Sequence, residues 1–196
     1  MFGPYPEIMY AVKGPDGKIY YSVAEKGGAV LYENGKALTE KGTKVVLSVF
    51  PDDSLLGYSP SACNAGIAYT ETGVDGKSRV VFREKTYGPY SALSVSSPVV
   101  SLDGKHLAWV TKGGDTERVW LDGKAQQGFG EIYAPENLKF SPNGKHLAYL
   151  ARDKIGVWAV LDGKAIAGPF ADPSMTGELG TTVSDIYITD KEMVVI

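Results

Sequence analysis

Apolar residues of this 196-residue chain lie in short runs that polar turns separate. The clearest run, Leu107–Val110, has four apolar residues in succession, without the polar alternation of a strand that has one wet face. In such a strand Leu107 and Trp109 share one face, and Ala108 and Val110 share the other. No apolar period of 3.6 residues persists over the roughly ten residues that a helix needs. The pattern therefore predicts an all-β fold whose second strands are covered on both faces.

Asp-Gly and Asn-Gly pairs lie between these runs and predict tight hairpins. The two-residue turns of β-hairpins need positive φ at their central positions, which these pairs tolerate. Asn143-Gly144 is therefore expected to join a first strand to a second, and Asp162-Gly163 a third to a fourth. The four strands expected around them are Asn137–Phe140, His146–Leu150, Val157–Leu161 and Ala165–Phe170.

The chain also repeats itself with a period of 40 residues. Leu107–Trp109 recurs as Leu147–Tyr149, and Ile67–Tyr69 precedes it at the same spacing. A second landmark, Leu121–Ala125, recurs as Leu161–Ala165 with the same shift. Two landmarks that move together indicate a structural repeat. Second strands are then expected at Ile19–Val23, Ile67–Thr70, Leu107–Val110, Leu147–Leu150 and Met193–Ile196.

The segment Phe140–Tyr149 carries a resemblance to a known family. It resembles the Ser-Pro-Asp-Gly-Lys-x-apolar-Ala-aromatic signature of the WD-like β-propeller repeats in TolB-type proteins and in the propeller domains of prolyl oligopeptidases. The likeness is strongest over residues 99–170 and fades towards both ends. It implies one propeller domain, 1–196, of about five four-stranded antiparallel blades. The expected blades are 9–50, 55–90, 95–133, 137–170 and 183–196, with the last one incomplete or closed by residues 1–8.

The side chains best suited to chemistry have structural explanations. His106 and His146 occupy the same slot after Gly-Lys, and we expect each to cap or orient its hairpin. Two imidazoles without suitably spaced carboxylates do not make a zinc site. Cys63 has no histidine nearby and is expected to be an inert buried thiol. Walker-type loops and Gly-x-Ser-x-Gly elbows are missing from the sequence. We therefore expect no catalytic residue, cofactor or metal, and a chain that is not an enzyme.

Carboxylates and irregularly placed aromatic residues remain as candidates for binding. The carboxylates expected in loops are interpreted as a solvated rim, although acid pairs about 5–10 Å apart would suit glycoside chemistry. These carboxylates are Asp52, Asp53, Asp115, Glu117, Glu131 and Glu136. Aromatic side chains with polar groups suit binding surfaces when exposed. The candidate partner surface consists of Tyr5, Tyr87, Tyr90, Phe129 and Tyr133.

Charge and composition exclude some partners. Twenty basic and 23 acidic side chains give a net charge of −3, which offers no electrostatic footprint for nucleic acid. No apolar run approaches the roughly 20 residues of a transmembrane segment. Met1–Tyr10 lacks the pattern of a signal peptide. Two locations stay open: the cytoplasm if Met1 is the native start, and the periplasm or another extracytoplasmic space if a signal peptide has been removed.

The resemblance implies a non-catalytic interaction or scaffold module that binds a protein or peptide partner through its loops. Two alternatives stay open. One is an accessory or gating propeller of a peptidase or another hydrolase, and the other is a propeller that binds carbohydrate or another small ligand. An uncovered edge at Val194–Ile196 would also favour self-association through strand pairing.

Overall fold

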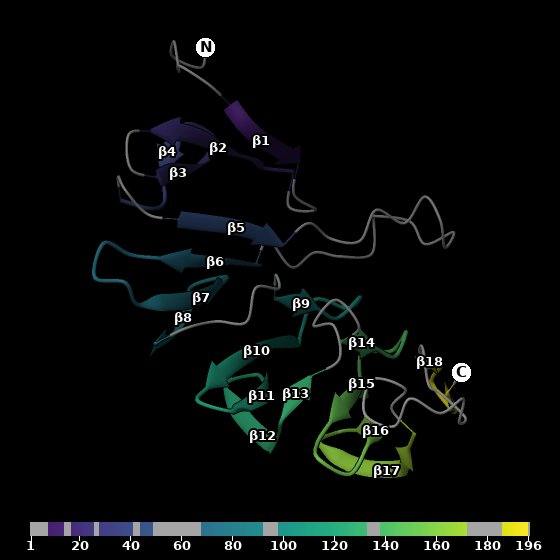
Figure 1. Cartoon of the computed structure of the whole chain (residues 1–196). Helices are drawn as coiled ribbons and strands as arrows, with labels where there is room; N and C mark the ends of the chain where they lie inside the picture. Colours follow the sequence, from purple (N-terminus) through teal and green to yellow (C-terminus); the bar gives the residue numbers. More distant parts are fainter. Residues whose placement is uncertain are drawn as a thin grey trace. The chain divides into compact units, whose positions relative to one another are not determined.

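The computed structural model describes residues 8–13, 17–25, 28–40, 44–48, 68–91, 98–132, 138–171 and 186–195. All regular secondary structure in these ranges is β-strand, and neighbouring strands pair antiparallel (Figure 1). The predicted all-β class is therefore confirmed for the described residues. The chain divides into two compact units, residues 1–91 and 92–196.

The first unit contains two four-stranded sheets, each in sequential order. One consists of β1 (Ile8–Lys13), β2 (Ile19–Glu25), β3 (Gly28–Glu33) and β4 (Lys36–Ala37). The other consists of β5 (Lys44–Ser48), β6 (Ala68–Thr72), β7 (Ser78–Phe82) and β8 (Lys85–Tyr90). β5 lies inside the predicted first repeat, 9–50, but it pairs with β6. The β-prone run Val45–Leu47 thus supplies the first strand of the second sheet.

The second unit contains two further sheets and a hairpin. One sheet consists of β9 (Val99–Val100), β10 (Leu107–Gly113), β11 (Thr116–Leu121) and β12 (Lys124–Phe129). The next sheet consists of β13 (Glu131–Ile132), β14 (Lys139–Phe140), β15 (Leu147–Arg152), β16 (Val157–Leu161) and β17 (Lys164–Phe170). β18 (Ile186–Ile188) pairs with β19 (Met193–Val195).

The short strand β13 belongs to a different sheet from the one that its position in the predicted repeat 95–133 indicates. It pairs with β15. Glu131 forms an ion pair with Arg152 of β15, and Ile132 is buried in the core between the two sheets. These two contacts hold the start of the connection against the later sheet.

The predicted second strands lie in β2, β6, β10, β15 and β19, except for Ile67 and Ile196, which are outside the described residues. In each of the four larger sheets this strand lies between two neighbours. All four residues of Leu107–Val110 and of Leu147–Leu150 are buried, which explains their unbroken apolar runs. The predicted closure by residues 1–8 concerns mainly residues 1–7, which are not described, whereas Ile8 pairs within the first sheet.

Asn143-Gly144 and Asp162-Gly163 both join the strands that the sequence predicts, but only Asp162-Gly163 does so in a two-residue turn. Asp162 and Gly163 both have positive φ, and they join β16 to β17 in a two-residue turn. Asn143 lies in a wider turn, in which the Ser141 N–H donates to the His146 carbonyl (2.9 Å) and only Gly144 has positive φ. The preceding Pro142 fixes a negative φ at its own position, and the chain makes a longer loop there.

The two sheets of the second unit pack through a shared core. Ala108, Val110 and Phe129 of the earlier sheet belong to the same buried cluster as Leu147 and Tyr149 of β15. The small side chain of Ala108 and the large ring of Tyr149 thus share the core between the two sheets. On the other face of β15 the core continues towards the final hairpin. It contains Ala148, Leu150, Val157, Ala159 and Ile186.

Tyr149 also makes a polar contact across this interface. Its hydroxyl donates to Gln126 Oε1 of β12 at 3.0 Å, and burial raises the pKa of the phenol. We expect Tyr149→Phe to lower the free energy of unfolding by about 1 kcal/mol, because Gln126 loses its donor while the ring still fills the core. Urea denaturation measures this. Tyr187→Phe, at a ring that is half exposed, is the matched control and should change stability little. Equal losses in the two variants would contradict the role of the Gln126 bond.

Candidate functional site

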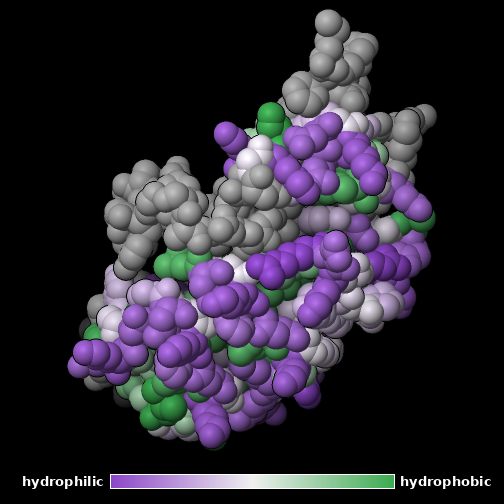
Figure 2. Space-filling view, turned by 180° about the vertical axis from the view of Figure 1, so that it is seen from behind, coloured by the Kyte–Doolittle hydropathy of each residue, from purple (hydrophilic) through white to green (hydrophobic). Residues whose placement is uncertain are grey.

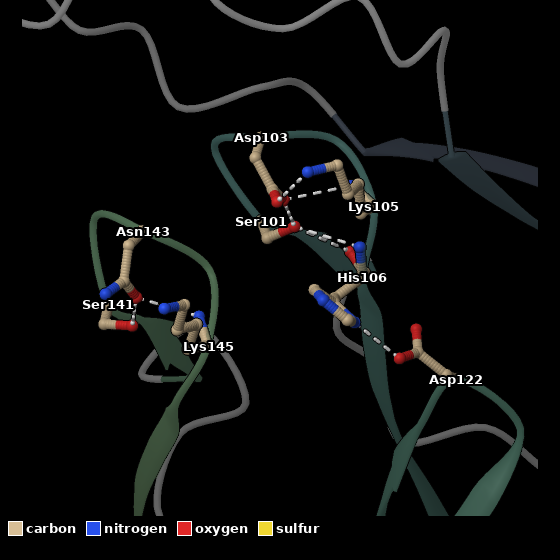
Figure 3. A network of polar contacts seen from close by, with 8 residues as sticks. All are labelled: Ser101, Asp103, Lys105, His106, Asp122, Ser141, Asn143 and Lys145. Atoms are coloured by element: carbon tan, nitrogen blue, oxygen red, sulfur yellow. Dashed lines mark hydrogen bonds and ion pairs between the residues drawn. The ribbon is translucent and has the colours of Figure 1, made fainter. Parts of the chain in front are cut away.

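Polar side chains gather at the turn that joins β9 to β10 (Figure 3). The Ser101 hydroxyl donates to Asp103 Oδ1 at 2.7 Å and accepts the His106 N–H at 3.0 Å. The Lys105 N–H donates to the same Asp103 oxygen at 3.1 Å. Partial burial opposes ionisation of Asp103, but the bonds from Ser101 and Lys105 outweigh it and hold the pKa of this carboxyl below its ordinary value. The ionised carboxylate therefore stabilises the turn.

The turn between β14 and β15 repeats this arrangement with an amide in place of the carboxylate. Ser141 donates to Asn143 Oδ1 (2.8 Å) and accepts the His146 N–H (3.1 Å). The Lys145 N–H donates to Asn143 Oδ1 at 3.0 Å. Figure 3 shows the two turns beside each other, each with its serine at the base of the loop. Because a neutral amide makes the same contacts, the geometry of the turn requires an acceptor oxygen at this position and not a charge.

The two histidines tie these turns to the next hairpin of the same sheet. His106 Nδ1 lies 2.7 Å from Asp122 Oδ2, and the other carboxylate oxygen accepts the Leu107 N–H at 2.9 Å. His146 and Asp162 repeat both contacts at the same distances. An ionised carboxylate only accepts hydrogen bonds, so the imidazole carries a proton on Nδ1. This contact supports the expected structural role of each histidine, although it reaches a different turn of the same sheet.

The aspartates of these pairs were missed by sequence reasoning about function. Asp122 and Asp162 were predicted only as turn residues, although each follows its histidine by 16 positions. A similar link occurs in the first unit, where Asn34 Oδ1 accepts the Ile19 N–H at 2.9 Å. In both sheets the aspartate follows the histidine by 16 residues, and the strand begins directly after the histidine. This repeated spacing is the sequence signal from which the contact could have been predicted.

Contacts between sheets occur at the same turns. A Cβ atom placed on Gly144 would lie 2.8 Å from Asp103 Oδ1, so the two turns are in close approach and glycine is needed there. The Asn143 N–H donates to Asp190 Oδ1 of the final hairpin at 2.8 Å. The His106 ring stacks against Phe140 with centroids 6.4 Å apart. The polar network thus aligns successive sheets as well as single hairpins.

The candidate carboxylates are only in part a solvated rim. Glu117 lies in β11, not in a loop, and is buried, and its Oε2 accepts the Ile132 N–H at 2.9 Å. Glu131 forms the ion pair with Arg152. Asp115 is exposed in the turn after β10. Glu117 is therefore a structural acceptor, because a buried amide needs a partner. Three further candidates and the predicted inert thiol lie outside the described residues: Asp52, Asp53, Glu136 and Cys63.

The five aromatic candidates do not form one described surface. Tyr87 and Tyr90 lie on β8, the outer strand of its sheet, and both are half-buried. Phe129 is only 5% exposed and belongs to the core of the second unit. It therefore cannot contact a partner without a change in packing. Tyr5 and Tyr133 lie outside the described residues.

Neither the comparisons with known proteins nor the geometry of the described residues identifies a ligand site of a known type. The chain matches no protein-family model, and no curated protein matches its sequence. Among the described residues, no group of three or more His, Cys, Asp or Glu side chains could hold a metal ion. The same part of the chain has no helix that is long and apolar enough to cross a membrane. The polar side chains of the described site therefore form hydrogen bonds that hold turns in place.

Proposed function

We propose that the chain is a module of the β-propeller type that binds a protein or peptide partner through its turns and performs no chemistry of its own. Sequential antiparallel sheets packed face to face, as in the second unit, are what propeller blades require. The proposed propeller has about five blades. The observation that carries the proposed function is that the polar groups best suited to chemistry hold the backbone of turns.

Hydrogen bonds from these polar groups hold the sheets, and the sheets in turn position the exposed loops. Both oxygens of Asp122 and of Asp162 are engaged by a histidine and a backbone amide, and Glu117 holds the Ile132 amide. Binding residues are common on loops that a rigid scaffold positions. The arrangement therefore favours recognition over catalysis.

Two turn tips carry apolar side chains where polar ones are usual. Val74, between β6 and β7, is 82% exposed, and Ile155, between β15 and β16, is 73% exposed. They are the most exposed large apolar side chains of the described residues. Hydrophilic residues cover most of the described surface visible in Figure 2, and hydrophobic residues form small separate areas. Each tip joins the second strand of its sheet to the third, so the two residues occupy equivalent positions in their sheets. We propose them as contact points for a partner.

The test is capture of partners from an extract of the native source by the immobilised chain. We expect a small set of proteins on the wild-type chain and roughly tenfold less on a chain with both Val74→Ser and Ile155→Ser, since each tenfold change in affinity needs only about 1.4 kcal/mol. Ile166→Ser, at an exposed residue of β17, is the matched control and should retain them.

Equal retention by all three chains would contradict binding through these turn tips. Capture of no protein, together with saturable binding to a glycan array, would overturn the proposed function in favour of the carbohydrate alternative. Either measurement uses the full chain, and circular dichroism of each variant verifies that its β-structure is intact.

A further inference from the structure

The first unit has a surface hollow between the end of β4 and the turn that joins β6 to β7. Its volume is about 440 Å³. Thr39 fixes one wall, since its buried Oγ1 accepts the Leu31 N–H at 3.0 Å. The opposite wall is a closed turn, in which the Gly73 N–H donates to the Lys77 carbonyl at 3.0 Å. Both walls are therefore held by hydrogen bonds before any ligand enters.

The hollow has surplus negative charge. Three carboxylates and one guanidinium line it: Glu40, Glu71, Asp75 and Arg79. Arg79 is already engaged, because its Nη2 donates to Asp75 Oδ2 at 2.9 Å and its Nη1 to the Lys77 carbonyl at 3.4 Å. Glu40 and Glu71 form no ion pair with another residue in the described ranges. A cation of a partner would therefore meet two carboxylates, Glu40 and Glu71, that form no direct ion pair with Arg79.

Apolar side chains border the same hollow. Leu38 is 37% exposed and Val74 is 82% exposed, and both line it. A charged side chain with a long aliphatic stem matches this combination, because the stem covers apolar surface while its head reaches the carboxylates. Lysine and arginine are the side chains of this kind, and a free metal ion or an anionic group would leave the apolar border uncovered.

We propose that the hollow receives a lysine or arginine side chain of an extended partner peptide, whose neighbouring apolar residues cover Leu38 and Val74. This inference rests on the proposed function and names the partner chemistry for one of its turn tips. Burial raises the pKa of Glu71, the Arg79 charge opposes this rise, and the Glu40 charge adds to it. A bound cation would relieve this cost, which favours occupancy by positive charge.

The test uses the full chain and a capped pentapeptide of sequence Gly-Leu-Arg-Leu-Gly, titrated at low ionic strength and followed by amide signals in two-dimensional NMR. We expect saturable shifts at Glu71 and Val74. The same peptide with citrulline in place of arginine keeps the shape and loses the charge, and it should bind roughly fivefold to tenfold more weakly. Glu71→Gln should weaken the arginine peptide by a similar factor.

Glu84→Gln is the matched control, because Glu84 is an exposed carboxylate of the same unit in the turn between β7 and β8. It should bind the arginine peptide like the wild type. Equal binding of the arginine and citrulline peptides, equal losses in Glu71→Gln and Glu84→Gln, or no saturable shift would each overturn the proposal. If Glu71→Gln still captures the partners that the wild-type chain captures, the hollow fails as a site while the proposed function stands.

Discussion

Ala108→Leu is expected to destabilise the chain by about 1–3 kcal/mol, because the added methyl groups have no space between two packed sheets. Ala108 is fully buried and shares its core cluster with Tyr149 and Leu147 of the neighbouring sheet. Interiors packed at native density accept an added volume only by moving side chains or backbone. Urea denaturation gives the free energy, and a thermal scan should show a midpoint lower by several degrees.

Ala125→Leu is the control for this substitution. Ala125 lies on β12 of the same sheet and is exposed, so leucine there adds apolar volume without entering the core. It should leave stability within about 0.5 kcal/mol of the wild type. A wild-type midpoint in Ala108→Leu would contradict the packing of the two sheets through this alanine, whatever the control does.

The strand positions were predictable because burial on both faces leaves a strong local pattern. Leu107–Val110 and Leu147–Leu150 have no polar residue, and each lies between two hydrogen-bonded neighbours. The Asp162-Gly163 turn was equally clear, since it needs positive φ at both positions. Sheet membership was harder, because the chain between two sheets has no local pattern that marks where pairing changes. β5 and β13 were placed in the wrong sheet for this reason.

The site was less predictable, because its contacts join residues far apart in the sequence. His106 was correctly given a structural role, but its partner Asp122 lies 16 residues away in another turn. Phe129 lies in an irregular segment, which suggested exposure, yet its ring completes the core between two sheets. Glu117 was expected in a loop, and its role depends on the Ile132 amide of a strand in the next sheet. Such pairings follow from tertiary packing and not from composition.

Asp162→Ala is expected to cost about 2 kcal/mol or more, since two separate losses combine. The Leu147 N–H loses its acceptor, Asp162 Oδ1 at 2.9 Å, and an unmet donor at a buried residue costs about 1–3 kcal/mol. Asp162 also has a φ of 51°, and alanine tolerates this left-handed conformation less well, by about 1 kcal/mol. Urea denaturation of the variant measures the sum.

Two further variants separate these losses from the contact with His146. Asp162→Gly removes the acceptor but relieves the backbone strain, so its cost should fall below that of alanine. Asp162→Asn keeps an acceptor oxygen and a residue that tolerates positive φ, as Asn34 does in the first unit. It loses only the exposed contact between the second carboxylate oxygen and His146 Nδ1, and an exposed polar contact of this kind is worth about 0–1 kcal/mol. The expected order of stability is therefore asparagine, glycine, alanine. If asparagine were as damaging as alanine, the contact between the Asp162 carboxylate and His146, and not the hydrogen bond to the Leu147 N–H, would be what holds the hairpin.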